Sequence, residues 1–443
     1  MSDPNISWLE TPPPNVFSNV FSDSFVWSMA RPWILLAICG LLHGLATFLP
    51  RVGTTGTIAA ELGSNAFLFN GSVDAAKAAL SLILQPAVGV MSDAHGRKPL
   101  LAFCLVMAAL PNLALLCGSI HVWSTLTVLV GPPGHAMHGL LIASVAESIR
   151  PEHRAGAIGI THALMYGFAN TIGTVAGSSL FTSFGRFSFA APLIIAAVNL
   201  LYLWALVPET LPKERTGGSH FLWAEMNPCR AFVLLAPGAD TPYVMLRVLC
   251  ACQFTVFCGF IGYMASLSLF LMSAFDLSAQ ETTPILAFSG ICSFIGMSGI
   301  GLVRRCGMDE IAIASVGLGM FVLAFSLAAV APAVPYFYAV SVLIGLGVTA
   351  PSAVASLVSS IASPSQQGAV QTLLGAFVTL AEGIGPLFFG IALTSSANTA
   401  MPGLPFTAST FGCLIAMGIL QASSRFRSPS KVHVGRAVKP LLV

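Results

Sequence analysis

Long apolar stretches alternate along the chain with short clusters of charged, proline or glycine residues. A helix needs about 20 residues to cross the hydrocarbon core of a bilayer, and most of the stretches are at least this long. Twelve such segments lie at 33–50, 66–91, 99–118, 122–146, 156–182, 188–207, 244–274, 284–303, 311–330, 335–361, 367–394 and 404–423. The pattern predicts an all-α polytopic membrane protein with twelve transmembrane helices.

An internal repeat divides these segments into two groups of six. The stretch "SIRPEHRAGA", which starts at Ser148, is matched in part by "SIASPSQQGA", which starts at Ser360. The offset between these two serines also takes Gly156 to Gly368, and the longest polar connection, 209–243, lies between the sixth and seventh segments. We therefore predict two pseudo-symmetric six-helix bundles, with the substrate path between them.

Composition places the chain in lipid. It is 56% hydrophobic and 8% charged, with a mean hydropathy of +0.85, whereas a soluble domain has about a quarter of its residues charged. The net charge of +2 gives no general affinity for nucleic acid. The ten cysteines show neither a disulfide framework nor a metal-ligand spacing, so we expect no metal and no cofactor.

The distribution of basic residues predicts the orientation. With both termini in the cytosol, fifteen of the nineteen Lys and Arg residues lie on the cytosolic side, and only Arg51 and Arg186 lie in connections on the other side. No address signal indicates which membrane holds the protein. The predicted parts are a cytosolic arm (1–32), a first bundle (33–208), a cytosolic central loop (209–243), a second bundle (244–423) and a basic cytosolic tail (424–443).

The connection between the second and third segments reads "GVMSDAHGRKPLL" and starts at Gly89. Asp93 is expected to accept hydrogen bonds from the amides that begin the third helix. Gly96 permits a tight turn, and Arg97 and Lys98 are expected at the cytosolic surface. Read alone, the stretch is a capped turn with a positive anchor.

The spacing G-x-x-x-D-x-x-G-R-K in this connection resembles the loop signature of the major facilitator superfamily. The resemblance implies a transporter fold in which the loop latches the two halves together in one conformation. "VPETLP", after the sixth segment, is also typical of that superfamily, and "RPEHRAGAIG" is similar to the tetracycline-resistance exporters. "FLFNGSVDAAKAALSLILQPAVGVMSDAHGRKPLL" and "PSAVASLVSSIASPSQQGAVQ" resemble the hippocampus abundant transcript family. The antiporter pattern of the fifth helix departs at Thr174 and Ser178, which weakens a prediction of drug or proton antiport.

Three charged residues inside the segments form a candidate gate. A charge at the bilayer centre costs roughly 2.5–3.5 kcal/mol even on the mildest scale. With a rise of about 1.5 Å per residue, Asp74, Lys77 and Glu382 lie at similar depth on the second and eleventh helices. One hypothesis is that Lys77 bridges Glu382 across the two halves, with Asp74 competing for it. The alternative is a local pair between Asp74 and Lys77, which share a helix face.

Six uncharged polar residues in the segments are candidates for contacts with a solute. They are His43, His135, His138, His162, Asn170 and Gln253. His135 and His138 share one face of the fourth helix and could sense protons or bind a polar solute. They could equally bond the backbone freed by Pro132 and Pro133. No third ligand for a metal is evident beside them.

These observations predict a secondary transporter. It would move a small solute by alternating access, facilitated or proton-coupled, as a monomer in the bilayer and without direct use of ATP. No phosphate loop, nucleotide-binding domain or nucleophile arrangement is recognisable, so we do not expect an enzyme. The alternative is a non-transporting receptor, trafficking factor or scaffold of the same fold, and a membrane-embedded hydrolase is a distant third.

Overall fold

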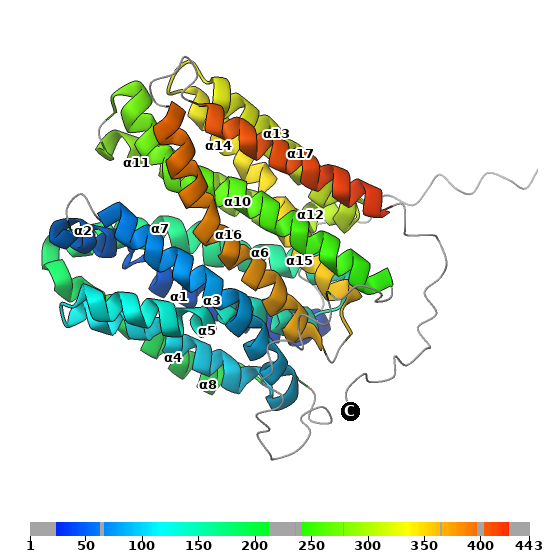
Figure 1. Cartoon of the computed structure of the whole chain (residues 1–443). Coiled ribbons are helices and arrows are strands. Elements are labelled where there is room, and N and C mark those ends of the chain that lie inside the picture. Colours follow the sequence, from blue (N-terminus) through cyan, green and yellow to red (C-terminus); the bar gives the residue numbers. More distant parts are fainter. Residues whose placement is uncertain are drawn as a thin grey trace, which may run out of the picture.

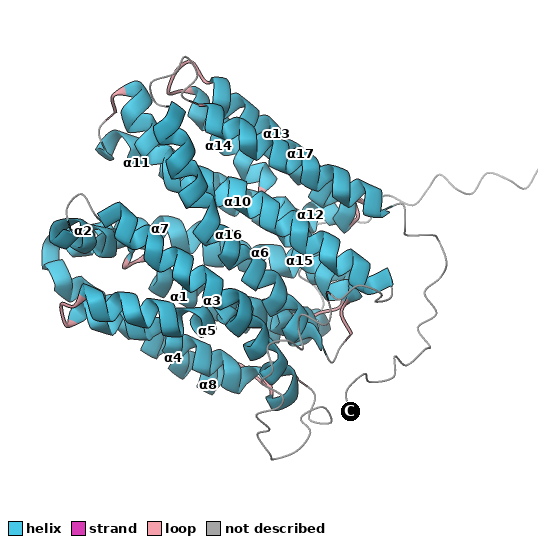
Figure 2. Ribbon diagram, in the orientation of Figure 1, coloured by secondary structure: helices cyan, strands magenta, loops and turns pink. Residues whose placement is uncertain are grey.

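The computed structural model describes residues 24–62, 66–211, 235, 241–277, 279–363, 366–396 and 403–424. Helices account for nearly all of these residues, and no strand occurs among them (Figures 1 and 2). Most of the central loop predicted at 209–243, all but the first residue of the tail predicted at 424–443 and the part of the predicted arm at 1–23 lie outside this part of the chain. The first helix begins at Ser24, within the segment predicted as an arm.

The first half of the chain forms the lower group of helices in Figure 1. Its elements are α1 (Ser24–Phe48), α2 (Arg51–Leu62), α3 (Ala66–His95), α4 (Arg97–Leu116), α5 (Ile120–Glu147), the short η3 (Pro151–His153), α6 (Arg154–His162), the π-helix η4 (Ala163–Phe168), α7 (Ala169–Phe184), η5 (Gly185–Phe189) and α8 (Ala190–Leu206).

The second half forms the upper group in Figure 1. Its elements are α10 (Thr241–Phe275), α11 (Ala279–Ser298), α12 (Ile300–Arg305), α13 (Glu310–Val330), α14 (Tyr336–Gly347), α15 (Thr349–Ile361), α16 (Gln367–Ser396) and α17 (Leu404–Ser424). The fold class predicted from the sequence is confirmed. α16 leaves the upper group and packs along α3 and α5 of the lower one.

Among the described residues, eleven stretches are long and apolar enough to cross a membrane, and one of them, Arg154–Leu206, holds 53 residues. With a rise of about 1.5 Å per residue, this stretch is far longer than a bilayer core of about 30 Å. It turns back at Gly185, where φ is 55°, so it supplies both the fifth and the sixth crossings. Twelve crossings are therefore consistent with the structure.

One helix lies where the sequence suggested only a connection. α2 follows the first crossing directly, and its Ile58 is buried in a small cluster with Phe189 and Trp123. A side chain on Gly53 would lie 2.7 Å from the ring of Phe181, so α2 packs closely on α7. Below, the end of the bundle that carries α2 is called the α2 end, and the end that carries Asp93 is called the Asp93 end.

Close glycine contacts join the two halves at the Asp93 end. A methyl group on Gly89 of α3 would lie 2.6 Å from the carbonyl oxygen of Gly368 in α16. A methyl group on Gly156 of α6 would lie 3.0 Å from the Cα atom of Gly301 in α12. The repeat offset that takes Ser148 to Ser360 also takes Gly89 to Gly301 and Gly156 to Gly368. The two crossings are therefore equivalent, which is the signature of a pseudo-twofold arrangement.

Candidate functional site

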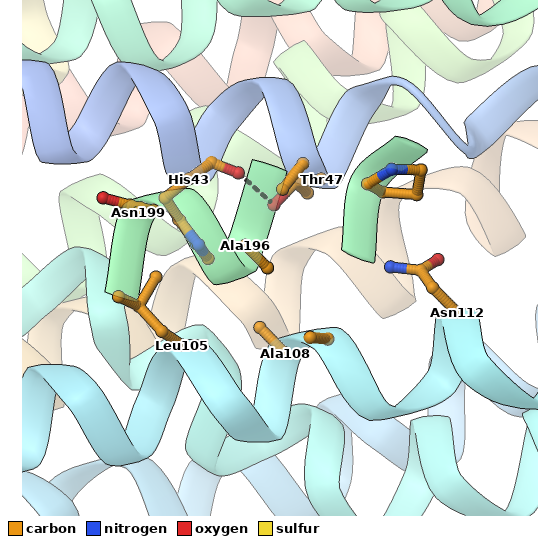
Figure 3. A pocket seen from close by; sticks show the side chains of 10 residues that line it. His43, Thr47, Leu105, Ala108, Asn112, Ala196 and Asn199 are labelled. Carbon is orange, nitrogen blue, oxygen red and sulfur yellow. Dashed lines mark hydrogen bonds between the residues drawn. The ribbon is translucent and has the colours of Figure 1, made fainter. Parts of the chain in front are cut away.

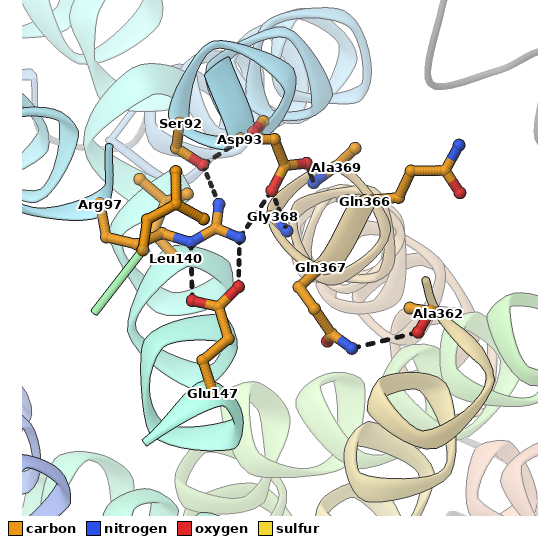
Figure 4. Close-up of polar contacts among 12 residues, drawn as sticks. Ser92, Asp93, Arg97, Leu140, Glu147, Ala362, Gln366, Gln367, Gly368 and Ala369 are labelled. Carbon is orange, nitrogen blue, oxygen red and sulfur yellow. Dashed lines mark hydrogen bonds and ion pairs between the residues drawn. The ribbon is translucent and has the colours of Figure 1, made fainter. Parts of the chain in front are cut away.

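Asp93, near the end of α3, binds the beginning of α16. Its Oδ1 accepts a hydrogen bond from the amide of Gly368 and its Oδ2 one from the amide of Ala369, both at 2.8 Å (Figure 4). The first amides of a helix have no partner within the helix and carry its positive partial charge, so a carboxylate is well matched to them. One side chain of the first half thus holds a helix of the second.

The expectation that Asp93 caps the following helix was wrong. Gly96, at φ 104°, makes the turn between α3 and α4, and Asp93 is left on the face of α3 toward α16. Glu209, from "VPETLP", takes the place at the start of α4. Its two carboxylate oxygens accept from the amides of Arg97 and Lys98, at 2.9 and 3.0 Å.

Arg97 was also expected at the surface, and it is instead 1% exposed. Its Nη2 lies 2.6 Å from Asp93 Oδ1 and 2.7 Å from Glu147 Oε1, and its Nε donates to Glu147 Oε2 at 3.1 Å. A guanidinium can be buried only where acids and hydrogen bonds replace its water, and two acids do so here. Lys98 fits the expectation better, because its Nζ reaches the carbonyl of Trp204 from a half-buried position.

At the second crossing of this end, the described residues supply no such carboxylate. The repeat takes Asp93 to Arg305, which is exposed. Arg154, at the start of α6, instead donates to the carbonyl oxygen of Ser359 at 3.4 Å. In the part of the chain that the structure describes, a carboxylate thus joins the halves at the α3–α16 crossing and not at the equivalent α6–α12 crossing.

The candidate gate residues Asp74, Lys77 and Glu382 come together with His135 where α3, α5 and α16 meet. Lys77 Nζ lies 3.1 Å from Asp74 Oδ1. The aliphatic part of Lys77 packs against α5, where a methyl group on Gly131 would lie 3.4 Å from Lys77 Cγ and Cδ. Glu382 Oε2 lies 3.9 Å from His135 Nδ1. Glu382 and His135 keep 27% and 35% of their side chains exposed, so the cluster is not fully enclosed by the protein.

The local pair between Asp74 and Lys77, the simpler of the two readings, is the one formed here. Asn70 supports it, since its Nδ2 donates to Asp74 Oδ2 at 3.1 Å. Among the described residues, the ion-pair neighbour of Glu382 is His135 and that of Lys77 is Asp74. The sequence placed Lys77 and Glu382 at one depth, but it could not give the rotation of the two helices, which decides the partners.

Two histidines that the sequence left unconnected are bonded to each other. The Nε2 atoms of His138 on α5 and His162 on α6 are 2.9 Å apart, and His162 Nδ1 lies 2.7 Å from Ser352 Oγ on α15. The ring of Tyr166, in η4, lies 5.3 Å from that of His138. Ser352 is 190 residues from His162 in the chain, so no local pattern could have identified it.

The remaining candidates take no part in the hydrogen bonds and ion pairs described above. His43 lines a small cavity inside the first half, between α1, α4 and α8, together with Asn112 and Asn199 (Figure 3). Asn170 accepts a hydrogen bond from Thr174 within α7, at 3.4 Å. Gln253 is buried in α10.

A polar contact across the halves that the sequence did not suggest joins Gln85 to Thr379, at 2.8 Å. It lies between the Asp93 contact and the charged cluster along α3 and α16. The two halves therefore meet through polar groups at three levels of one seam.

The model of the Major Facilitator Superfamily matches residues 17–386, most of the chain. The chain belongs to this superfamily. The loop that carries Asp93 and Arg97 is thus a facilitator loop, as its spacing indicated. Facilitators move small solutes across membranes, and this facilitator is an integral, multi-pass membrane protein.

Relatives of this facilitator are similar along most of their length. Hippocampus abundant transcript-like protein 1 of Bos taurus is 26% identical over 389 residues, which cover 80% of this chain and 73% of the relative. Major facilitator superfamily domain-containing protein 10 of Homo sapiens is 27% identical over 353 residues, covering 73% and 72%. The resemblance to the hippocampus abundant transcript family is therefore confirmed.

Solved structures share the fold. The human organic anion transporter MFSD10 (TETRAN) superposes with a TM-score of 0.74 at 22% identity, over 89% of this chain and 99% of that one. The transporter FucP, in the outward conformation, superposes with a TM-score of 0.69 at 15% identity, over 90% and 99%. At these identities the likeness concerns the fold alone.

Proposed function

We propose that this facilitator is a secondary carrier, which moves a small solute between its two halves by alternating access and without direct use of ATP. The observation that carries the proposal is the bonding of Asp93 to Gly368 and Ala369. A carrier must close one end while the other opens, so it needs contacts between the halves that form and break. A carboxylate on helix amides is such a contact, because water can replace either partner when the halves separate.

We further propose that the Asp93 end faces the cytosol, with both termini on that side. The support is the concentration of Lys and Arg at this end of the predicted helices. In this arrangement the conformation described here is closed toward the cytosol.

For the solute, we propose an organic anion. Lys77 supplies a cationic group where the two halves meet and His135 supplies a ring nitrogen that can donate a hydrogen bond, and they are now beside Asp74 and Glu382. An incoming anionic group can displace either carboxylate from its partner, which gives the solute a contact that changes with conformation. A relative of similar fold is described as an organic anion transporter, which agrees with this choice.

Uptake into proteoliposomes tests the proposal. A panel of small carboxylates and sulfonates is compared with sugars and organic cations, with and without a pH gradient and with and without the same solute inside. A carrier gives saturable uptake that internal solute accelerates, because both directions use one site. Binding of a panel solute without any flux would overturn the proposal in favour of a receptor or scaffold.

A further inference from the structure

The bonded histidines on α5 and α6 have chemistry that the proposed function does not use. We propose that His138 and His162 together form a binding site for one proton, which couples solute movement to a proton gradient. This inference rests on the proposed carrier function. Four observations support it: the bonding pattern of the two rings, their link to the other half, their surroundings and their connection to the exposed cluster.

The bonding pattern limits the pair to one added proton. With 2.9 Å between the two Nε2 atoms, one nitrogen must donate and the other must accept. If His162 gains a proton at Nδ1, its Nε2–H still donates to His138 and its Nδ1–H donates to the hydroxyl oxygen of Ser352. Every hydrogen bond is kept, and the hydroxyl only turns from donor to acceptor. Full protonation of both rings would set two N–H groups against each other and break the bond.

The link to Ser352 joins the pair to the movement of the halves. His138 and His162 belong to the first half, and Ser352 belongs to α15 of the second. His162 is 5% exposed, whereas separation of α6 from α15 would remove Ser352 and expose His162 Nδ1 to water. The state of the halves therefore decides whether this nitrogen can exchange its proton with solvent.

The surroundings of the pair are polar and carry few formal charges. His43 approaches from α1, His135 lies one turn away on α5, Tyr166 stands over both rings from η4, and Glu382 lies beside His135 from α16. No acid of the described residues lies within ion-pair distance of His138 or His162. An added charge would be held by the two rings and Ser352, which keeps the site poised to release it.

The π-helix η4 begins directly after His162 and supports the arrangement. It runs from Ala163 to Phe168 and interrupts the α-helix that would otherwise continue from α6 into α7. Its Tyr166 ring lies 5.3 Å from His138 and 6.1 Å from His162. Single π-turns inside helices are frequent at functional sites, and this one places the Tyr166 ring in contact with both histidines.

Access to the pair runs along α5. His135 and His138 are three residues apart and share a helix face, and His135 lies 3.9 Å from Glu382. Exposure falls from 35% of the His135 side chain to 5% of His162. The partly exposed Glu382 and His135 therefore give a second route to the pair, on the His138 side, separate from the one that opens when Ser352 leaves His162.

Two transport assays on the same proteoliposomes test the coupling. Exchange of solute at equal pH measures movement of the halves, and accumulation driven by a pH gradient measures coupling. We expect the exchange rates of H162Q and H138Q to stay within about twofold of the unmodified protein. Their accumulation of solute under a pH gradient should fall by about tenfold or more. The matched control is H121Q, since His121 is an exposed histidine at the other end of α5; both of its activities should match those of the unmodified protein.

Loss of exchange and accumulation in equal measure would show a structural role and overturn the proposal, as would accumulation that does not depend on the pH gradient. A second measurement needs no transport: ¹⁵N-histidine NMR of the purified protein, with H138Q and H162Q used to assign the signals. We expect the two rings together to gain one proton on acidification. Gain of two protons, or of none down to the pH of unfolding, would overturn the one-proton site. Absence of any flux from the unmodified protein would instead count against the carrier function.

Discussion

Glu382 and Asn170 are related by the repeat offset and occupy equivalent positions in the two halves, but only Glu382 carries a charge. The same offset takes Lys77 to Ser289, which is fully buried. The neighbouring contacts are also related: a methyl group on Gly383 would lie 2.6 Å from Ala78 Cβ, and one on Gly290 would meet Thr171. The two seams between the halves therefore share their backbone packing and differ in chemistry, because at these equivalent positions only Lys77 and Glu382, on the α3–α16 seam, are charged.

This asymmetry predicts that Glu382 is needed for transport. In Glu382→Gln the contact with His135 loses its charge, so binding of an anionic solute no longer releases a charged contact between the halves. We expect uptake to fall at least about tenfold, which corresponds to about 1.4 kcal/mol. Uptake by proteoliposomes measures the effect, and Glu61→Gln, which neutralises an exposed acid on α2, serves as the control. Equal uptake by the two variants would refute the role of Glu382.

Asp93→Asn should weaken the closed state at the Asp93 end. The amide side chain can accept from only one of the two backbone amides, and its NH₂ group opposes the other. Hydrogen bonds to charged groups contribute roughly 1.5–3 kcal/mol each, so we expect the open population to rise about tenfold or more. Spin labels on Pro99→Cys and on the native, exposed Cys306 report the separation of the halves at this end, in a background with Cys117→Ser and Cys229→Ser. An unchanged distance distribution would contradict the prediction.

Gly89→Ala should also raise the population that is open at the Asp93 end, here for a steric reason. The new methyl group would lie 2.6 Å from the carbonyl oxygen of Gly368, which is closer than such contacts allow. The halves must then stay slightly apart at this crossing, and the same pair of spin labels should show a longer mean distance. Gly319→Ala is the control, because a methyl group there meets nothing within 4 Å. If both variants behave alike, the close crossing is not what holds this end together.

Two native cysteines test the orientation. Cys117 and Cys306 are exposed, and they lie at the α2 end and the Asp93 end. In Cys229→Ser protein, a membrane-impermeant maleimide should label Cys117 only from the non-cytosolic side and Cys306 only from the cytosolic side. Peptide mapping after labelling of intact and permeabilised membranes gives the result. The reverse pattern would invert the predicted topology.

The number of crossings and the superfamily could be predicted from sequence because both depend on contiguous residues. In lipid, the backbone N–H and C=O groups of each crossing must be hydrogen-bonded within its own helix. Every span is therefore one continuous apolar stretch of sequence. The loop from Gly89 to Lys98 is likewise contiguous. Charged and histidine side chains stood out because a mainly apolar chain carries few of them.

The partners of those side chains could not be predicted, because they come from distant segments. Asp93 binds amides 275 and 276 residues away, and His162 meets Ser352 across 190. Glu147 and Glu209 surround the start of α4, but in sequence each is only an acid at the end of an apolar segment. Arg97 was expected at the surface because basic residues usually anchor there, and two acids from other helices reversed that preference.

The difference between the two glycine crossings at the Asp93 end has a mechanical meaning. One crossing carries the hydrogen bonds of Asp93 to α16. At the other, Gly156 and Gly301 bring two helix backbones together with no side chain between them. Two helices that touch only through backbone atoms can rotate against each other without first separating interdigitated side chains. Breaking the Asp93 contact between α3 and α16 would therefore let the halves rotate about the Gly156–Gly301 contact. The first crossing then holds the halves closed, and the second is the axis about which they move.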